Sequence, residues 1–441
     1  MKEKLALLLL LLLSAALLFA QGRKIEFVEY DLDNGLHVIL HEDHSTPIVA
    51  VTVFYHVGSK NEHPERTGFA HFFEHLMFEG SEYITRGDYD KIVMDNGGTL
   101  NATTDFDRTY YYEILPSNLL ELGLWLESER MLHLKIDSAG VETQRKVVKE
   151  ERKQRLDNQP YGSVLEETFK RAYKEHPYNW TPIGSAQYID LATYSEFMDF
   201  YKQYYVPENT VLSIAGDIDI DYAKELVEKY FADISNGKAA IVRPDKVEPV
   251  QTTEIRDIVY DNIQLPLVLH AYHIPKKSSD DTYALDMLTT LLSSGQSSRI
   301  YKELVDNQQK ALQAGSFPLT LEEPGLFLAY AICNVGVSAE DLEASLQAEL
   351  DRVKNEIISD KEFEKLQNQI ENQFVSSNST VAGIAGSLSD YYVYYGNTDL
   401  INTEIEKYMS VKKEDIKRVA NQYLNKENRV VLYYLPKSDK K

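Results

Sequence analysis

The stretch GFAHFFEHLMFEG, residues 68–80, is mostly apolar and helix-like, yet it contains His71, Glu74 and His75. Positions i and i+4 lie on the same face of a helix, so the two imidazoles point the same way and the Glu74 carboxylate borders them. Two imidazoles side by side suit a tetrahedral zinc ion. The alternative is that these are ordinary surface or core histidines. The shared face favours a metal site, because three buried polar groups need a partner.

The same spacing predicts a chemical role for the carboxylate. Zinc lowers the pKa of a bound water to about 7. A carboxylate at the position of Glu74 can take the proton from that water as hydroxide attacks a carbonyl group. This order of residues, H-x-x-E-H, is the reverse of the commoner zinc-protease motif.

A zinc site requires a third protein ligand, and a long charged helix predicted over residues 138–158 offers Glu150 and Glu151. Glu151 follows Val147 by four residues and Val148 by three, so it continues an apolar stripe toward the interior. Glu150 is turned away by about 100°, the rotation per residue of an α-helix. Helical phase therefore favours Glu151 and leaves open the alternative that both carboxylates are solvated.

Composition restricts the class of protein. The chain has 441 residues, 43% of them hydrophobic, which is enough for two or three globular domains. Its formal net charge is −23, which argues against nucleic acid as a partner. Cys333 is the single cysteine, so an intrachain disulfide and a thiolate metal cluster are both excluded.

Residues 1–20 resemble a signal peptide, with basic residues at the start, an apolar segment over residues 5–20, and a small residue, Ala20, at the end. The alternative is an uncleaved anchor helix, for which the apolar run is short. We expect an exported protein, periplasmic or extracellular, without a stable membrane span after cleavage.

The remaining chain alternates between strands and helices. Strands are predicted at 37–42, 49–59, 210–219, 254–261, 266–275, 325–335 and 428–436, a strand pair at 98–116, and helices at 67–80, 84–97, 118–133, 138–158, 280–294 and 338–357. In the first of these helices Thr67 is the predicted N-cap. The order of elements before a linker at 236–251 is repeated after it. This predicts two similar α+β domains at 21–235 and 252–441, of which only the first binds metal.

Several segments resemble one protein family. They are VGSKNE, TGFAHFFEHLMFEG, GGTLNATTDFDRTYYY, VVKEER, PENTVLSIAGDID and SSGQSSRIYKEL. Together they resemble the pitrilysin family of inverzincin metallopeptidases, in the branch of mitochondrial processing peptidase and its bacterial relatives. The resemblance covers about residues 25–435. It implies an α+β fold of two structurally similar domains, each a mainly antiparallel sheet packed against helices, together forming half of a clamshell.

The resemblance also implies the ligand set and the substrate strand. Glu151 corresponds to the third ligand of one Zn²⁺ per chain, although the same donors accept manganese or cobalt. Asn101, Ala102, Thr103 and Thr104 correspond to an edge strand that holds the peptide extended, which agrees with recognition of main chain by β-augmentation. The alternative for this stretch is an ordinary strand and turn.

Three positions depart from the pattern of the family. A glutamate that braces the metal site in the family is replaced by Gln144, which can donate a hydrogen bond but adds less charge. An arginine and a tyrosine that grip the substrate carbonyl in the family are replaced by Val305 and Leu312. The nearby Arg299 belongs to the preceding motif and is interpreted as structural. We therefore expect a homologous partner subunit that supplies the missing arginine and tyrosine.

The predicted function is a zinc-dependent endopeptidase that hydrolyses extended, unfolded peptides. The alternative is a non-catalytic scaffold subunit that keeps the peptidase fold, against which the intact set of His71, Glu74, His75 and Glu151 argues. A nucleotide-dependent enzyme is not supported, because the segment around Gly295 lacks the lysine and spacing of a phosphate loop.

Overall fold

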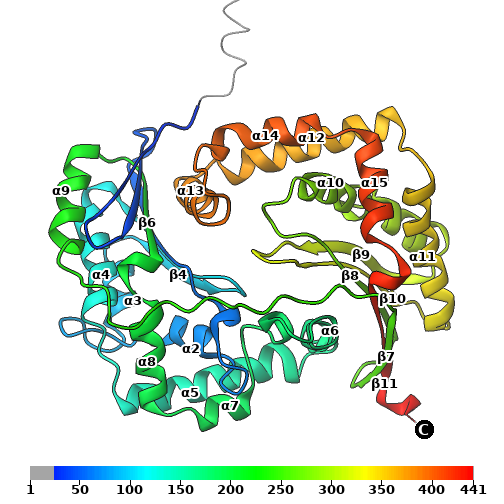
Figure 1. Cartoon of the computed structure of the whole chain (residues 1–441), viewed down its shortest axis with the longest axis horizontal. Helices are drawn as coiled ribbons and strands as arrows, with labels where there is room; N and C mark the ends of the chain where they lie inside the picture. The colour runs from blue at the N-terminus through cyan, green and yellow to red at the C-terminus, as the bar shows by residue number, and fades with distance from the viewer. Residues whose placement is uncertain (1–23, 441) are drawn as a thin grey trace, which may run out of the picture.

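Two β-sheets, each covered by helices, lie side by side in a computed structural model that describes residues 24–440 (Figure 1). The predicted signal segment, residues 1–20, lies outside the described residues. Among the described residues, none of the helices combines the length and the apolar character that crossing a bilayer requires.

The first sheet has six strands in the order β1-β2-β6-β3-β5-β4. The strands are β1 (Val28–Asp31), β2 (His37–Glu42), β3 (Ile48–Tyr55), β4 (Thr99–Thr104), β5 (Thr109–Pro116) and β6 (Thr210–Gly216). Only β2 and β6 run parallel, and the other neighbours are antiparallel. β3 is buried along nearly its whole length, which explains its continuous run of apolar residues: helices cover both faces of the sheet.

The second sheet has five strands in the order β7-β11-β8-β10-β9. They are β7 (Ile255–Asp261), β8 (Leu267–His273), β9 (Ala311–Leu319), β10 (Leu326–Cys333) and β11 (Arg429–Pro436). Again a single pair, β11 and β7, is parallel. Strand for strand, this order repeats β2-β6-β3-β5-β4 of the first sheet. The fold class predicted from the sequence, two similar α+β units with mainly antiparallel sheets, is therefore confirmed.

The helices divide between the two halves of the chain. The first half contains α2 (Phe69–Leu76), α3 (Asp88–Asp95), α4 (Leu120–Leu132), α5 (Ser138–Arg152), α6 (Val164–Ala172), α7 (Ala186–Leu191), α8 (Tyr194–Tyr204) and α9 (Ile220–Phe231). The second half contains α10 (Asp281–Ser293), α11 (Ala339–Asn355), α12 (Asp360–Ser377), α13 (Val381–Tyr395), α14 (Leu400–Ser410) and α15 (Lys413–Tyr423). A π-helical turn, Lys153–Asp157, continues α5.

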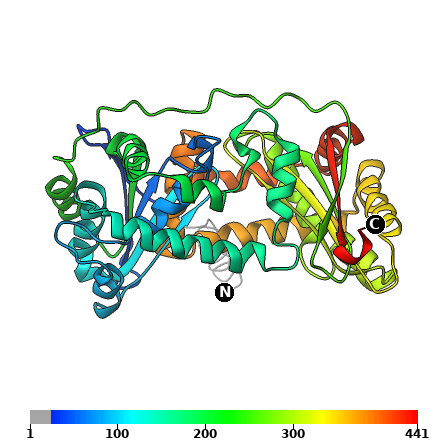
Figure 2. The same ribbon diagram turned by 90° about the horizontal axis from the view of Figure 1, so that it is seen from below.

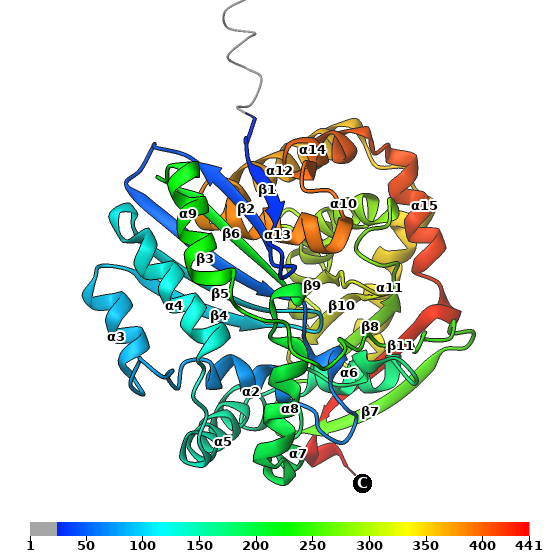
Figure 3. The same cartoon turned by 60° about the vertical axis from the view of Figure 1, so that its left-hand side comes forward.

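One helix of each half packs on the sheet of the other half. On the first sheet, α4 and α9 pack over one face (Figure 3), and the opposite face is covered by α13 from the second half. In return, α6 of the first half packs on β8 and β11 of the second sheet. Two of the four hydrophobic clusters therefore contain residues from both halves.

An extended segment joins the halves. Between α9 and β7 the described chain contains neither helix nor strand, and Figure 2 shows this segment crossing from one half to the other along one side of the molecule.

Candidate metal centre

Helix α2 is held at its start by a side chain from outside the helix. Gly68 precedes the helix with φ of 97°, a conformation that favours glycine. The predicted N-cap, Thr67, is wrong: its hydroxyl accepts a hydrogen bond from the Ser185 amide instead. The cap is supplied by Glu62, whose carboxylate accepts hydrogen bonds of 2.8 Å from the amides of Gly68 and Ala70. A carboxylate at this position complements the positive end of the helix dipole.

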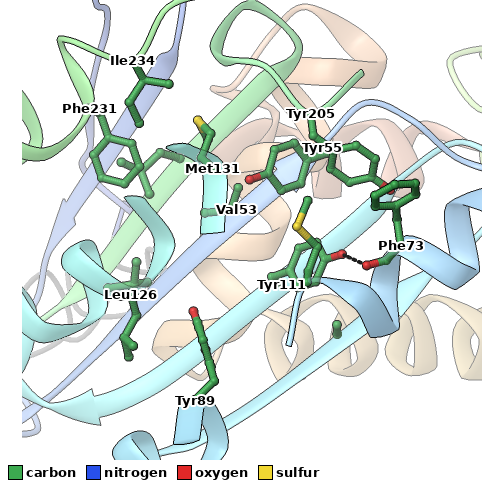
Figure 4. Close-up of a cluster of buried hydrophobic side chains, with 14 of the residues drawn as sticks. Val53, Tyr55, Phe73, Tyr89, Tyr111, Leu126, Met131, Tyr205, Phe231 and Ile234 are labelled. Carbon is green, nitrogen blue, oxygen red and sulfur yellow. Dashed lines mark hydrogen bonds between the residues drawn. The ribbon is translucent and has the colours of Figure 1, made fainter. Parts of the chain in front are cut away.

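The apolar face of α2 fixes its rotation. Phe72, Phe73 and Leu76 are fully buried in the core of the first half. The Tyr111 hydroxyl donates a hydrogen bond of 3.3 Å to the Phe73 carbonyl (Figure 4). This packing turns the other edge of the helix, with its two histidines, toward α5.

His71, His75 and Glu151 converge on one point. The Nε2 atoms of the two histidines are 3.3 Å apart, and Oε2 of Glu151 lies 3.5 Å from Nε2 of His71 and 3.0 Å from Nε2 of His75. The two rings stand at 89° to one another. Within the described part of the chain, these three residues are the one group of histidine, cysteine and acidic side chains whose ligand atoms gather closely enough for a metal.

These distances fit a divalent cation. Tetrahedral zinc with bonds of about 2.0–2.1 Å separates neighbouring ligand atoms by about 3.3 Å. The buried Oε2 atom of Glu151 makes no hydrogen bond of acceptable geometry. Two nitrogens and one oxygen that carry lone pairs therefore face a common centre, and a cation would satisfy all three.

The electrostatics of the site suit a metal as well. Burial, and then the neighbouring His75, lower the pKa of His71 to about 4, so this imidazole is neutral near pH 7, as a ligand must be. The His75 imidazole also lowers the pKa of the Glu151 carboxyl. On the far side of that carboxylate, Nη1 of Arg155 lies 2.8 Å from Oε1. This contact was missed in the sequence, although its i,i+4 spacing is a recognisable signal.

Glu74 borders the same cavity as the three converging side chains. Burial raises the pKa of its carboxyl, and the nearby Thr104 hydroxyl and His75 imidazole oppose that shift. A raised pKa favours a carboxylate that accepts and then releases a proton.

The cavity has a volume of about 760 Å³ and lies between α2, α5 and β4. Asn101, Ala102, Thr103 and Thr104, the predicted substrate strand, all line it. β4 pairs with β5 on one side and is the last strand of the described sheet, so its other edge is open to an added strand. Glu150 also lines the cavity, but its side chain is 56% exposed against 16% for Glu151.

Gln144 lies about two helical turns before Glu151 on α5. Its amide donates a hydrogen bond of 2.6 Å to Oε1 of Glu79, which also forms an ion pair with Arg86. Among the hydrogen bonds of the described residues, none joins Gln144 to either imidazole. Its contact is with the segment that follows α2.

The second half has a different set of side chains at the positions expected to grip a carbonyl. Val305 is partly buried against the second core, and Leu312 on β9 is 61% exposed. Arg299 forms a two-armed ion pair with Glu362, with N–O distances of 3.0 and 3.2 Å. This agrees with the structural role predicted for that arginine.

Comparisons with known proteins give a consistent result. Residues 37–184 match the family described as Insulinase (Peptidase family M16), and residues 192–370 match the family described as Peptidase M16 inactive domain. The chain is 34% identical to the Zinc protease PqqE of Helicobacter pylori (strain ATCC 700392 / 26695), over 97% of this chain and 98% of that protein.

Two further matches extend the comparison. A solved structure described as a protease from Helicobacter pylori superposes with a TM-score of 0.90 at 33% identity, covering 93% of this chain and 100% of that one. The Probable mitochondrial-processing peptidase subunit beta, mitochondrial, of Arabidopsis thaliana is 25% identical over 89% of this chain and 75% of that protein.

Proposed function

The chain belongs to the insulinase (M16) family of peptidases, and from this premise we propose that it is a zinc-dependent endopeptidase. Membership confirms the family predicted from the sequence motifs. The observation that carries the proposal is the convergence of His71, His75 and Glu151 beside the open edge of β4. The family supports a zinc peptidase in general, and the catalytic activity of this chain is the proposal.

In this proposal each residue has a separate task. His71, His75 and Glu151 hold the zinc ion, which when bound would polarise the peptide carbonyl and lower the pKa of water. Glu74 takes a proton from the attacking water and delivers it to the leaving amine. Its partly buried carboxyl, with a raised pKa, suits both directions of transfer.

We propose that the substrate is an extended, unfolded peptide. An added strand along the open edge of β4 would bond through main-chain groups and tolerate many side chains. The exposed Asn101 and Thr103 of this strand line the cavity that contains the metal ligands.

We also propose that a homologous partner subunit completes the site, the two chains closing as a clamshell. Val305 and Leu312 are unable to donate a side-chain hydrogen bond to a substrate oxygen, so the expected arginine and tyrosine must come from elsewhere. The relative in Arabidopsis is itself named as a subunit, which supports this arrangement. Full turnover by a monomer in gel filtration would exclude the requirement.

Export to the periplasm or the extracellular space is proposed from the composition of residues 1–20. A chain with one cysteine does not depend on an intrachain disulfide in either compartment.

The test combines zinc content with one substitution. The purified chain should contain one zinc ion, and Glu74→Gln should keep that zinc while hydrolysis of an unfolded protein falls by at least about 100-fold, the usual contribution of a general base. A chain that binds zinc but cleaves only with a homologue present would support the partner. A chain without zinc and without cleavage would favour the scaffold alternative.

A further inference from the structure

A buried loop, residues 58–62, connects the second half of the molecule to both sides of the candidate active site. The inference that follows rests on the proposed function, because it assigns β4 to the peptide. The loop contacts the start of α2, the turn between β4 and β5, and the loop between β9 and β10 of the second half.

The contact with the turn after β4 is made by main chain. The Lys60 amide donates a hydrogen bond of 3.0 Å to the Phe106 carbonyl. A Cβ atom at Gly58 would lie 2.5 Å from the Asp107 amide nitrogen, so the two segments approach as closely as only glycine permits.

The contact with the second half is made by buried charges. The Lys60 side chain is 3% exposed, and its Nζ lies 2.8 Å from Oδ1 of Asp107 and forms a second ion pair with Glu322. The Glu322 carboxylate also lies 2.7 Å from Nε2 of His56. The main-chain amide of Glu322 donates a hydrogen bond of 2.9 Å to Oδ2 of Asp107. A buried ammonium requires such partners, because an uncompensated buried charge is strongly destabilising.

The other end of the loop holds the metal helix. The Glu62 carboxylate accepts hydrogen bonds from the amides of Gly68 and Ala70, as described above. It also accepts one of 3.0 Å from the indole Nε1–H of Trp180. One short loop thus joins the first turn of α2 to the tip of the β4–β5 hairpin.

A second contact holds the same hairpin tip from the second half. Nη1 of Arg108 lies 3.1 Å from Oδ1 of Asp390 on α13, and Nζ of Lys277 lies 3.3 Å from the other oxygen of that carboxylate. The guanidinium of Arg108 also lies 4.8 Å from the centre of the Tyr110 ring.

We propose that Lys60 is a positioning residue through which the second half sets the distance between the peptide-binding strand β4 and the metal helix α2. β4 is bonded to a neighbour on one edge only, so its tip needs support from outside the sheet. A displacement of about 1 Å between a bound peptide and the reacting groups is enough to cost about 100-fold in rate. The second half, in whose described residues no cluster of metal ligands is found, thereby contributes directly to the geometry of the site.

The test replaces Glu322 and compares it with its neighbour. Glu322→Gln removes one charge from the network while keeping the size of the side chain, and Glu323→Gln makes the same change at an exposed position. In Glu322→Gln, hydrogen exchange of the amides at residues 101–108 should accelerate by about tenfold, because the hairpin tip opens more often. Zinc content should stay at the wild-type level, and Glu323→Gln should match the wild type in both measurements.

Kinetics separate positioning from a loss of folded protein. Positioning predicts that kcat for an unfolded peptide, counted per zinc-bound folded molecule, falls by about tenfold in Glu322→Gln, with a smaller change in KM. A purely structural role predicts an unchanged kcat per folded molecule, because only the number of folded molecules falls. Where Glu322→Gln fails to fold, Glu322→Asp keeps the charge, shortens its reach, and should shift exchange in the same direction.

Wild-type exchange at residues 101–108 together with an unchanged kcat per folded molecule in Glu322→Gln would overturn the proposal. Hydrogen exchange does not depend on turnover. An inactive protein whose hairpin loosens in Glu322→Gln would therefore contradict the proposed function and leave the structural role of Lys60 supported.

Discussion

Adjacent residues in one helix have different surroundings at the metal centre. The Glu151 side chain is 16% exposed and faces two imidazoles, whereas the Glu150 side chain is 56% exposed. The helical phase that favoured Glu151 assumed that Val147 and Val148 are both buried. Val148 is fully buried, but Val147 is 43% exposed. The buried stripe is narrower than the sequence pattern indicates, and Glu151 lies at its edge.

Replacing Glu151 with glutamine should weaken zinc binding by at least about 10–100-fold, the range known for loss of an outer hydrogen-bond partner of a metal ligand. A neutral amide lacks the charge that attracts the cation. Titration with a chelator measures the affinity, and Glu150→Gln is the matched control one residue away. Equal zinc affinity in the two variants would remove Glu151 from the ligand set.

At the residue scale, local contacts were predictable and long-range contacts were not. His71, Glu74 and His75 lie within one turn and a half of helix, so their spacing alone brought them together. The cap of α2 comes from Glu62, in a loop that folds back onto the helix, and helix-start rules that inspect the adjacent residue therefore selected Thr67.

At the scale of elements, the exchange of α6 and α13 between the halves is the main feature that the sequence did not predict. Periodicity indicates that a helix has a buried face, but it does not say which sheet covers that face. The inward side of α13 contacts Ile39, Ala50 and Phe54, which lie far away in the chain on β2 and β3. The order of strands was more predictable, because each strand is marked by its own local composition.

Leu388→Ala should destabilise the protein by about 2–5 kcal/mol, the range for truncating a buried leucine. Leu388 on α13 is fully buried in the cluster shared with the first sheet, so the substitution leaves a cavity between the halves. Denaturant unfolding measures the loss. Val375→Ala, on a residue that is 61% exposed, should change stability by less than about 0.5 kcal/mol. Two separate unfolding transitions, of which only that of the second half is weakened, would contradict the shared core.

At the scale of the whole molecule, the second half repeats the strand order of the first but has other side chains at the positions of the metal ligands. The second half has a cavity of about 440 Å³ lined by α10, α12, α13, α14 and β9. Of these, α10, α12 and β9 correspond to α2, α5 and β4. Asp286, Thr290 and Ser293 of α10 line the cavity, where α2 presents two histidines. Equivalent strand order therefore predicts a cavity, whereas only the side chains decide whether it binds metal.

The linker is fixed to the first half before it reaches the second. Arg243 forms hydrogen bonds to Asn209 and to the His56 carbonyl, and the Glu248 carboxylate accepts main-chain amides at residues 174–176. Between these anchors Val247 is 81% exposed. The covalent connection is therefore accessible at a point where the chain on both sides is already held.

A protease site placed between Lys246 and Val247 should allow the chain to be cut without separating its halves. The helices α6 and α13 would still be packed on the opposite sheets, so the nicked protein should elute as one species in gel filtration and separate only in denaturant. Residues 24–246 expressed alone should aggregate, because the face of the first sheet that α13 covers would be exposed as an apolar patch. Two nicked halves that elute apart, each with native near-ultraviolet circular dichroism, would show that the halves fold independently. That result would also remove the basis for control of β4 by the second half, since hairpin and loop would then keep their structure without Glu322.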